Sequence, residues 1–163
     1  MFLALSLAAA TLSQPRINTQ IDPIDDTKSV YVIVGTPSAY LALGCQNVAD
    51  RSTIRVVAKF DRYVGDGVPG LIAGGTVLQY RFDQRPASTV RWYSHDREVT
   101  AEAARTSPIK FMLEMKGSTR AYLRAQNYDA DPVGMALNYE DPTVLIEEVL
   151  TQCGFNADGT VAN

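Results

Sequence analysis

Alternation of apolar and polar residues along much of the chain predicts short β-strands. In the segment 53–60, for example, Ile54 and Val56 fall on one side and Arg55 falls on the other. A period of two residues is the pattern of a strand that buries one face. Segments of this kind, several of them rich in β-branched or aromatic residues, are 28–34, 39–45, 53–60, 76–82, 89–93, 109–115, 119–126 and 133–139.

Turn signals separate these segments. Residues 35–38 and 116–118 each contain glycine and suit hairpins between neighbouring strands, and the glycine-rich segment 61–75 predicts a loop. Residues 98–105 suit one short additional helix.

One helix is strongly indicated near the end of the chain. Asp141 is a favourable N-cap, Pro142 fits the first helical position, and Gly154 suits the position just after the helix. Between them an apolar stripe recurs at i, i+3, i+4 and i+7, which is the spacing of one buried helix face. The stripe consists of Ile146, Val149, Leu150 and Cys153.

Together these elements predict a mainly β fold: an antiparallel β-sandwich or open barrel with one C-terminal α-helix. The expected organisation is a single β-rich domain over residues 28–155. A polar, proline-containing segment (14–27) leads into it, and a flexible tail (156–163) follows.

Residues 1–13 carry no charged side chain and are almost wholly apolar or small. A run of this length matches the apolar region of a secretory signal peptide and is too short to span a bilayer. Thr11 and Ser13 flank Leu12 in a small-x-small arrangement that suits cleavage, although no Lys or Arg precedes the run. We therefore expect a signal peptide over 1–13 and a periplasmic or secreted mature protein. A buried N-terminal strand or helix is the alternative.

The two cysteines, Cys45 and Cys153, bear on the same expectation. In an oxidising compartment such a pair is expected to form a disulfide, and two free buried thiols are the alternative. Since Cys45 ends an alternating strand and Cys153 lies on the inner stripe of the helix, a bridge requires the helix to pack on that strand. Closing a loop of roughly a hundred residues would contribute on the order of 4 kcal/mol.

Composition narrows the range of partners. The formal net charge over 163 residues is −3, and the sequence pI is about 5.1. Nucleic-acid-binding proteins more often carry a basic face, so the acidic balance argues against nucleic acid and anionic lipid as main partners. No segment after the leader approaches the roughly 20 apolar residues of a membrane span, so no stable membrane insertion is expected once the leader is removed. The expected partner is an unidentified protein or cell-envelope component.

Candidate chemistry is concentrated in residues 80–96, which contain the only His and the only Trp. Ser94, His95 and Asp96 are the residue types of a hydrolase triad, but neighbours in an extended segment point to opposite faces, so we assign no catalytic residue. Arg81 is expected to pair with Asp83 or Asp96 at a strand end. The candidate binding or structural cluster is Arg81, Asp83, Trp92, Ser94 and Asp96.

Metal and cofactor sites find little support. One His and two distant cysteines are too few for a zinc site, and the spacing of Asp22, Asp25 and Asp26 lacks the glycine and glutamate of an EF-hand loop. The glycines of 65–67 and 74–75 lack the Lys-Ser or Lys-Thr that ends a phosphate-binding loop. We expect no metal and no cofactor.

Several residues within about 28–155 recur in a characteristic order and spacing: Leu43-Gly44-Cys45-Gln46, Arg81-Phe82-Asp83, Pro86, Trp92, Ser94 and Cys153-Gly154-Phe155. In this order and spacing the chain resembles the VasI/TagO-type periplasmic proteins associated with type VI secretion. The chain departs from the family pattern at 138–142, where the family often has an aliphatic strand end and a Gly-Leu helix start. The resemblance implies an exported accessory or binding protein, associated with type VI secretion in some members and without established catalytic residues.

The sequence thus favours an exported, non-catalytic accessory or binding protein of the bacterial envelope. Two alternatives stay open. One is a hydrolase of cell-wall material, and the other is a periplasmic inhibitor or immunity-type protein.

Overall fold

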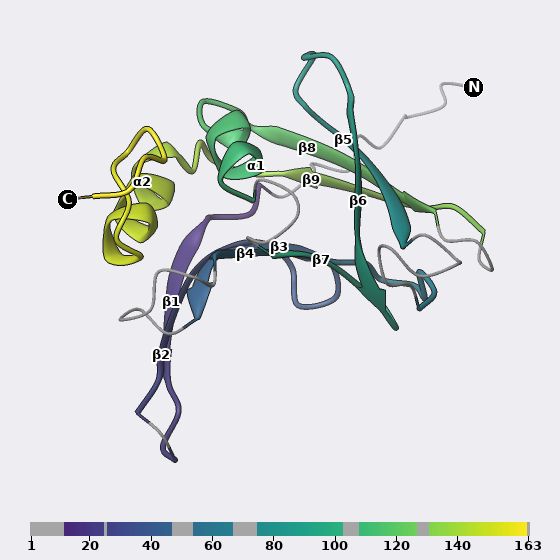
Figure 1. Ribbon diagram of the computed structural model, residues 1–163. Coiled ribbons are helices and arrows are strands. Elements are labelled where there is room, and N and C mark those ends of the chain that lie inside the picture. Colours follow the sequence, from purple (N-terminus) through teal and green to yellow (C-terminus); the bar gives the residue numbers. More distant parts are fainter. Residues whose placement is uncertain are drawn as a thin grey trace, which may run out of the picture.

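The computed structural model describes residues 12–24, 26–46, 54–66, 75–102, 108–126 and 131–162. About half of these residues lie in strands, and the predicted mainly β fold is confirmed (Figure 1). The elements are β1 (Arg16–Ile21), β2 (Lys28–Gly35), β3 (Tyr40–Gln46), β4 (Ile54–Lys59), β5 (Thr76–Phe82), β6 (Ser88–His95), β7 (Glu98–Glu102), α1 (Pro108–Met115), β8 (Arg120–Gln126), β9 (Val133–Asn138) and α2 (Thr143–Gln152).

The strands form one nine-stranded sheet in the order β1-β2-β3-β4-β7-β6-β5-β8-β9, and every pairing between them is antiparallel. Strand β6 is shared between two parts of this sheet. Its residues 88–92 pair with β5, whereas its residues 93–95 pair with β7. The sheet therefore bends along β6, which crosses from the layer of β5, β8 and β9 to the layer of β4 and β7 (Figure 1).

The two edges of the sheet approach each other at one corner. Ser13, just before β1, bridges to Tyr139, just after β9. The Ser13 amide donates to the carbonyl of Asn138 over 3.0 Å, and the amide of Glu140 donates to the carbonyl of Ser13 over 3.3 Å. Ser13, the last residue of the predicted leader, thus belongs to the folded domain.

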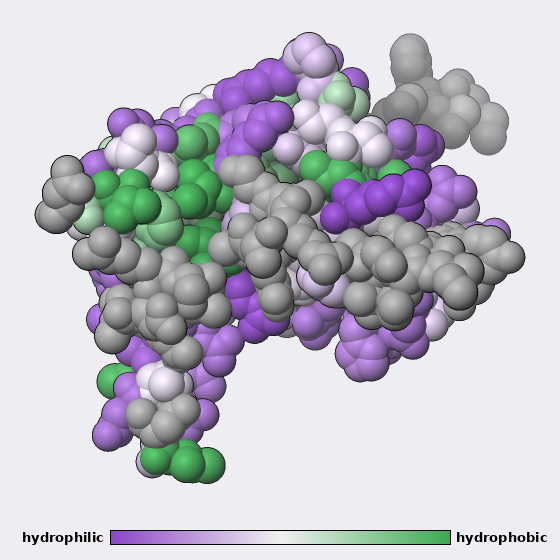
Figure 2. Space-filling model, viewed as in Figure 1, coloured by the Kyte–Doolittle hydropathy of each residue, from purple (hydrophilic) through white to green (hydrophobic). Residues whose placement is uncertain are grey.

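The β1–β2 hairpin projects from the rest of the molecule (Figure 1). Strand β1 falls within the segment 14–27, which the sequence predicts only as a polar lead into the domain. Ile21 and Ile24 at the end of the hairpin are 61% and 92% exposed, and hydrophobic residues are visible at this tip (Figure 2).

Helix α1 occupies a segment whose sequence predicts a strand, so the prediction for 109–115 is wrong. Pro108, Phe111, Met112 and Met115 are its buried residues, and their spacing is helical. A short apolar run fits either period, and burial against the sheet decides in favour of the helix. Residues 116–118 accordingly connect a helix to β8 and do not form the predicted hairpin turn.

The short helix predicted over 98–105 is also wrong, because residues 98–102 form β7. Val99 and Ala101 are buried, and Thr100 between them is not. Strand β7 pairs on one side with β4 and on the other with β6, and these two ladders outweigh the weak helical preference of its sequence.

The aromatic core lies between α1 and the inner face of β5 and β6. The ring of Phe111 lies 4.6 Å from that of Tyr80, 5.1 Å from that of Phe82 and 5.4 Å from that of Trp92, measured between centroids. Tilted and edge-on aromatic pairs at these distances stabilise a core beyond the area that they bury.

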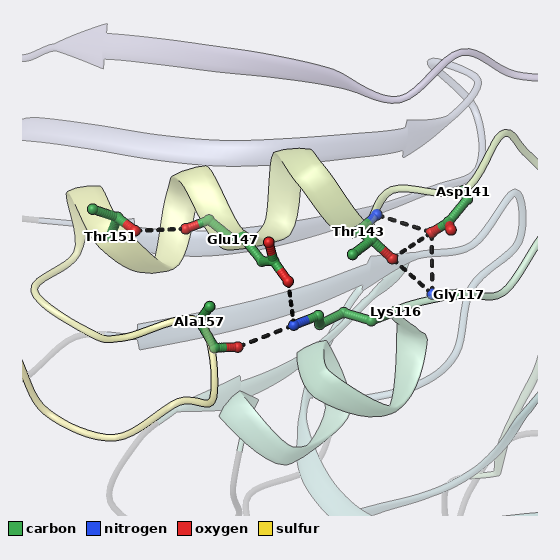
Figure 3. A network of polar contacts seen from close by, with 7 residues as sticks. All are labelled: Lys116, Gly117, Asp141, Thr143, Glu147, Thr151 and Ala157. Atoms are coloured by element: carbon green, nitrogen blue, oxygen red, sulfur yellow. Dashed lines mark hydrogen bonds and ion pairs between the residues drawn. The ribbon is translucent and has the colours of Figure 1, made fainter.

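Helix α2 begins at Thr143, with Pro142 as its N-cap residue. Asp141, which the sequence predicts as the N-cap, lies one residue before Pro142 and still caps the helix. Its carboxylate accepts the amide of Thr143 over 2.9 Å and the amide of Gly117 over 3.1 Å. Figure 3 shows that this contact joins the start of α2 to the turn after α1. The ammonium of Lys116 makes a second link, 2.5 Å from the carboxylate of Glu147.

The predicted end of the helix is confirmed at Gly154, which has a φ of 82°. Its amide donates to Thr151, and the next amide, of Phe155, donates to Leu150. These two bonds form a Schellman motif, in which a glycine tolerates the left-handed conformation.

The tail differs from the flexible segment that its composition predicts. Phe155 bridges to Val161, and Lys116 donates to the carbonyl of Ala157. Gly159 lies so close to α1 that a Cβ there would be 2.4 Å from Cγ2 of Ile109. Residues 156–162 therefore fold back onto α1.

The predicted Cys45–Cys153 disulfide is confirmed, with 6.0 Å between the Cα atoms and a sequence separation of 108 residues. Helix α2 contacts β2 and β3, as a bridge from Cys45 in β3 requires. Within the described part of the chain, no helix has both the length and the apolar character needed to cross a membrane.

The cap of α2 gives the protein an acid-sensitive contact. Burial raises the pKa of Asp141, but the hydrogen bonds from Thr143 and Gly117 outweigh this and hold it below its ordinary value of 3.8. A lowered pKa in the folded state means stabilisation that is present above pH 3.8 and is lost as the pH falls through the folded-state value.

We therefore expect Asp141→Ala to lower the free energy of unfolding by about 1 kcal/mol at neutral pH. Urea titrations should show this difference shrinking below pH 3.8 as the wild-type carboxylate becomes protonated. Asp141→Asn, which keeps an acceptor oxygen without the charge, is the control and should lose less. A difference between wild type and Asp141→Ala that stays constant with pH would contradict the role of the charged cap.

Candidate functional site

The five residues of the predicted cluster do not form one site. Arg81 is exposed on the outer face of β5, and its guanidinium lies 4.8 Å from the centroid of the Tyr122 ring. Among the residues that the structure describes, it forms no ion pair with Asp83 or Asp96. The predicted pairing of Arg81 is therefore replaced by a cation–π contact.

The two aspartates of the cluster occupy turns at opposite ends of β6. Asp83 follows β5, and Asp96 lies between β6 and β7; their φ angles are 49° and 54°, in the left-handed region. One carboxylate oxygen of Asp83 accepts the amide of Thr119 over 3.1 Å and the amide of Arg120 over 3.0 Å. Asp83 thus joins the β5–β6 turn to the start of β8.

The other two members face the interior. Trp92 is 2% exposed and packs against Phe111. Ser94 is 7% exposed, and its hydroxyl oxygen accepts a hydrogen bond from the hydroxyl of Thr76. Trp92 therefore packs β6 against α1, and Ser94 joins β6 to β5.

The hydrolase arrangement of Ser94, His95 and Asp96 does not assemble. Ser94 is buried, whereas the side chain of His95 is 91% exposed, so they lie on opposite faces of β6. Nδ1 of His95 lies 2.9 Å from Oδ1 of Asp66, and the same oxygen accepts the amide of Asp96. The Asp96 amide is the main cause that holds the pKa of Asp66 below 3.8, and His95 adds to it. This group fastens the segment after β4 to the β6–β7 turn.

A groove lies between the β5–β6 hairpin and α1, and Trp92 of the predicted cluster lines it. It consists of two hollows of about 230 and 270 Å³ that share Tyr80 and Ser88. Trp92 and Lys110 line the first, and Arg85 lines the second. Each hollow is smaller than the 300–1,000 Å³ typical of sites for drug-sized ligands, and their size suits a single side chain or a small polar group.

Polar contacts hold the wall of this groove in place. The hydroxyl of Tyr80 donates to Oε2 of Glu114 over 2.8 Å, and Lys110 lies 3.5 Å from the same carboxylate. Burial first, and then the hydrogen bond and charge of Glu114, raise the pKa of Tyr80 far above its ordinary value of 10.0, so the phenol stays protonated. A phenol held in this way can donate a hydrogen bond but is not poised as a base.

Arg85 closes one end of the groove. Its guanidinium donates to the carbonyl of Glu114 and, over 3.1 Å, to the carbonyl of Lys116. These are among the carbonyls left unpaired at the C-terminal end of α1, where a cation is also favoured by the helix dipole.

The pairing of Lys110 with Glu114 was missed because the sequence pattern predicts a strand over 109–115. In an extended strand these two residues lie too far apart to pair. In a helix the two residues lie at i and i+4, on one face. The signal for the helix was present in the sequence: Pro108 at a helix start, followed by an apolar stripe at positions 111, 112 and 115.

Within the described residues, no three His, Cys, Asp or Glu side chains lie close enough together to hold a metal ion. Of the three aspartates whose spacing the sequence sets aside as a calcium loop, Asp25 lies outside the described residues. The carboxylate of Asp22 accepts the amide of Ile24, which is a local turn contact.

Comparison of the chain with protein-family models, with curated proteins and with solved structures finds no match.

The two turn aspartates provide a matched pair of substitutions. Asp83→Gly should lower the free energy of unfolding by about 1–3 kcal/mol, because two backbone amides lose their acceptor. Asp96→Gly should change it by no more than about 0.5 kcal/mol, since the Asp96 carboxylate is exposed. Glycine accepts a positive φ at both positions, so the comparison isolates the carboxylates. Equal losses in chemical denaturation would show that the Asp83 carboxylate has no special role.

Proposed function

We propose that this chain is an exported, non-catalytic binding or accessory protein of the bacterial cell envelope, acting in the periplasm or after secretion. The observation that carries the proposal is the Cys45–Cys153 disulfide, which joins β3 to the end of α2. Disulfides persist in oxidising compartments and are rare in the cytosol. The apolar leader of the sequence supports the same compartment.

The engagement of polar side chains supports a non-catalytic role. Ser94 is buried beside Thr76, the Asp83 carboxylate accepts backbone amides, and the Tyr80 phenol is bonded to Glu114. A catalytic group must reach a reacting atom at a free, aligned position. These side chains instead hold strands and helices together.

The resemblance to VasI/TagO-type proteins supports a second part of the proposal, an association with type VI secretion. Several of the matching residues have structural roles in this chain: Asp83 in a turn, Trp92 in the core, Cys45 and Cys153 in the bridge, and Gly154 after α2. Their pattern thus supports a shared fold more directly than a shared partner. Co-transcription with type VI secretion genes would support the association, and phage structural genes beside this gene would contradict it.

Export is tested by expressing the chain with its leader in a bacterial host and fractionating the cells. The protein should appear in the periplasm or the medium. Thiol alkylation under denaturing conditions should modify no cysteine before reduction and both cysteines after it, as the bridge predicts. A Cys45→Ser variant, with one reactive thiol before reduction, calibrates the assay.

The N-terminus of the exported protein shows where the leader is cleaved. Because Ser13 pairs with Asn138 and Glu140, we expect cleavage before Ser13, in the small-residue run 8–11. Intact mass should show a mature chain that retains Ser13. A cytosolic protein with two reactive thiols would overturn export. Release of muropeptides that is lost on His95→Ala or Asp96→Asn would overturn the non-catalytic role.

A further inference from the structure

Four arginines gather on the outer face of the layer formed by β6, β5 and β8. Residues of these strands alternate between core and surface, so every second side chain faces outward. The outward set includes Arg81 on β5, Arg91 on β6, and Arg120 and Arg124 on β8, all of them exposed. They come from two separate stretches of the chain, 81–91 and 120–124, which strand pairing brings side by side.

The strand register fixes their spacing. Arg81 lies opposite Tyr122, which stands midway between Arg120 and Arg124 on β8. Neighbouring strands are about 4.8 Å apart, and alternate residues along a strand are about 6.7 Å apart. Arg81 is therefore about 8 Å by backbone position from each of the two arginines on β8. The three guanidinium groups form a zigzag along the face.

Neighbouring side chains hold two of these groups in place. Arg81 lies over the ring of Tyr122, and Arg124 donates to Oε1 of Gln79 from Nε over 3.0 Å and also from Nη2. Guanidinium groups that are already oriented lose less conformational freedom when a ligand binds.

The charge of this face is opposite to that of the chain. The outward residues of β5, β6, β8 and β9, all of which the structure describes, include no Asp or Glu. Asp83 lies at one end of the face, and its carboxylate accepts the amides of Thr119 and Arg120. Since the net charge is −3, removing four arginines leaves −7 for the rest of the chain. Such asymmetry favours an acidic partner at this face and disfavours it elsewhere.

We propose that the arginine face, defined by Arg81, Arg91, Arg120 and Arg124, docks an extended acidic segment of a partner protein. Alternate side chains of an extended chain recur at about 6.7 Å, which the long arginine side chains can match. Each guanidinium group can bind a carboxylate through two parallel N–H···O bonds. On β9, Gly134 and Ala136 are exposed and small, which leaves the face flat beside β8. The inference rests on the proposed binding function and gives it a class of partner.

Two other polyanions fit the face less well. Single-stranded nucleic acid binds by stacking its bases on aromatic rings, and the Tyr122 ring in the middle of the face is covered by Arg81. Membrane surfaces take up apolar side chains together with basic ones. The large hydrophobic residues exposed in the described part of the chain lie elsewhere, among them Ile21 and Ile24 at the tip of the β1–β2 hairpin (Figure 2).

The test measures binding of the purified, oxidised protein to a fluorescently labelled peptide of alternating glutamate and threonine by anisotropy. The peptide should bind at an ionic strength of about 0.1 M and more weakly as salt is added. The triple variant Arg81→Gln/Arg120→Gln/Arg124→Gln should weaken binding at least about tenfold, from the loss of three charge-assisted contacts. The variant Arg81→Lys/Arg120→Lys/Arg124→Lys keeps the three charges but cannot form two parallel hydrogen bonds to a carboxylate. It should weaken binding less than the glutamine variant does.

The matched control is Arg16→Gln/Arg62→Gln/Arg97→Gln, which removes three exposed arginines outside the face and changes the net charge equally. It should bind as the wild type does. Equal binding by both triple variants, or no binding of the peptide, would overturn the arginine face as an acidic-peptide site. Tighter, face-dependent binding of inorganic polyphosphate, an oligonucleotide or phosphatidylglycerol vesicles would overturn the partner class while leaving a binding function intact. Purified protein is used throughout, so failure of export cannot produce these results.

Discussion

The covalent bond between Cys45 and Cys153 is the constraint on which the arrangement of this fold depends. It joins β3 to Cys153, the C-cap residue of α2, across 108 residues of sequence. A loop of that length corresponds to about 4–5 kcal/mol of stabilisation in the chain-entropy model. The bridge holds α2 against β2 and β3, and α2 in turn contacts α1 and the corner where the sheet edges meet. Among the residues that the structure describes, the strand pairing at that corner is the bridge of Ser13 to Tyr139.

The alternation of side chains along β5, β6 and β8 gives the molecule two different surfaces from the same strands. On the inner face of β5 and β6, the rings of Tyr80, Phe82 and Trp92 surround Phe111 of α1. On the outer face, the alternate positions collect arginine. The pairing of β5 with β6 and β8 fixes the register of the outer residues, so the backbone spacing of the charged groups is a property of the fold.

The alternation of apolar and polar residues predicted most of the strands correctly. The strand pattern at Cys45 and the helical stripe at Cys153 also predicted which two elements the disulfide joins, because each of these patterns is local. The predictions failed at 109–115 and at 98–105, where the local pattern was ambiguous. Burial against the sheet decided for a helix at the first segment, and pairing with β4 and β6 decided for a strand at 98–102. The candidate cluster failed for a related reason. Arg81 lies near Trp92 and Ser94 in the sequence, but it faces outward from β5 whereas they face inward from β6. The arginine face could not be predicted from the sequence, since its members on different strands meet only through the register of β5 with β6 and β8.

The central claim is that the disulfide keeps α2 in place on the sheet. Native-state hydrogen exchange tests it most directly, in a comparison of the oxidised protein with the Cys45→Ser/Cys153→Ser variant. We predict that the amides of α2 lose most of their protection in the variant through a local opening. The amides that pair β5 with β8 should keep protection close to the global limit. Equal protection of α2 in both proteins, or a uniform loss across the whole sheet, would contradict the claim.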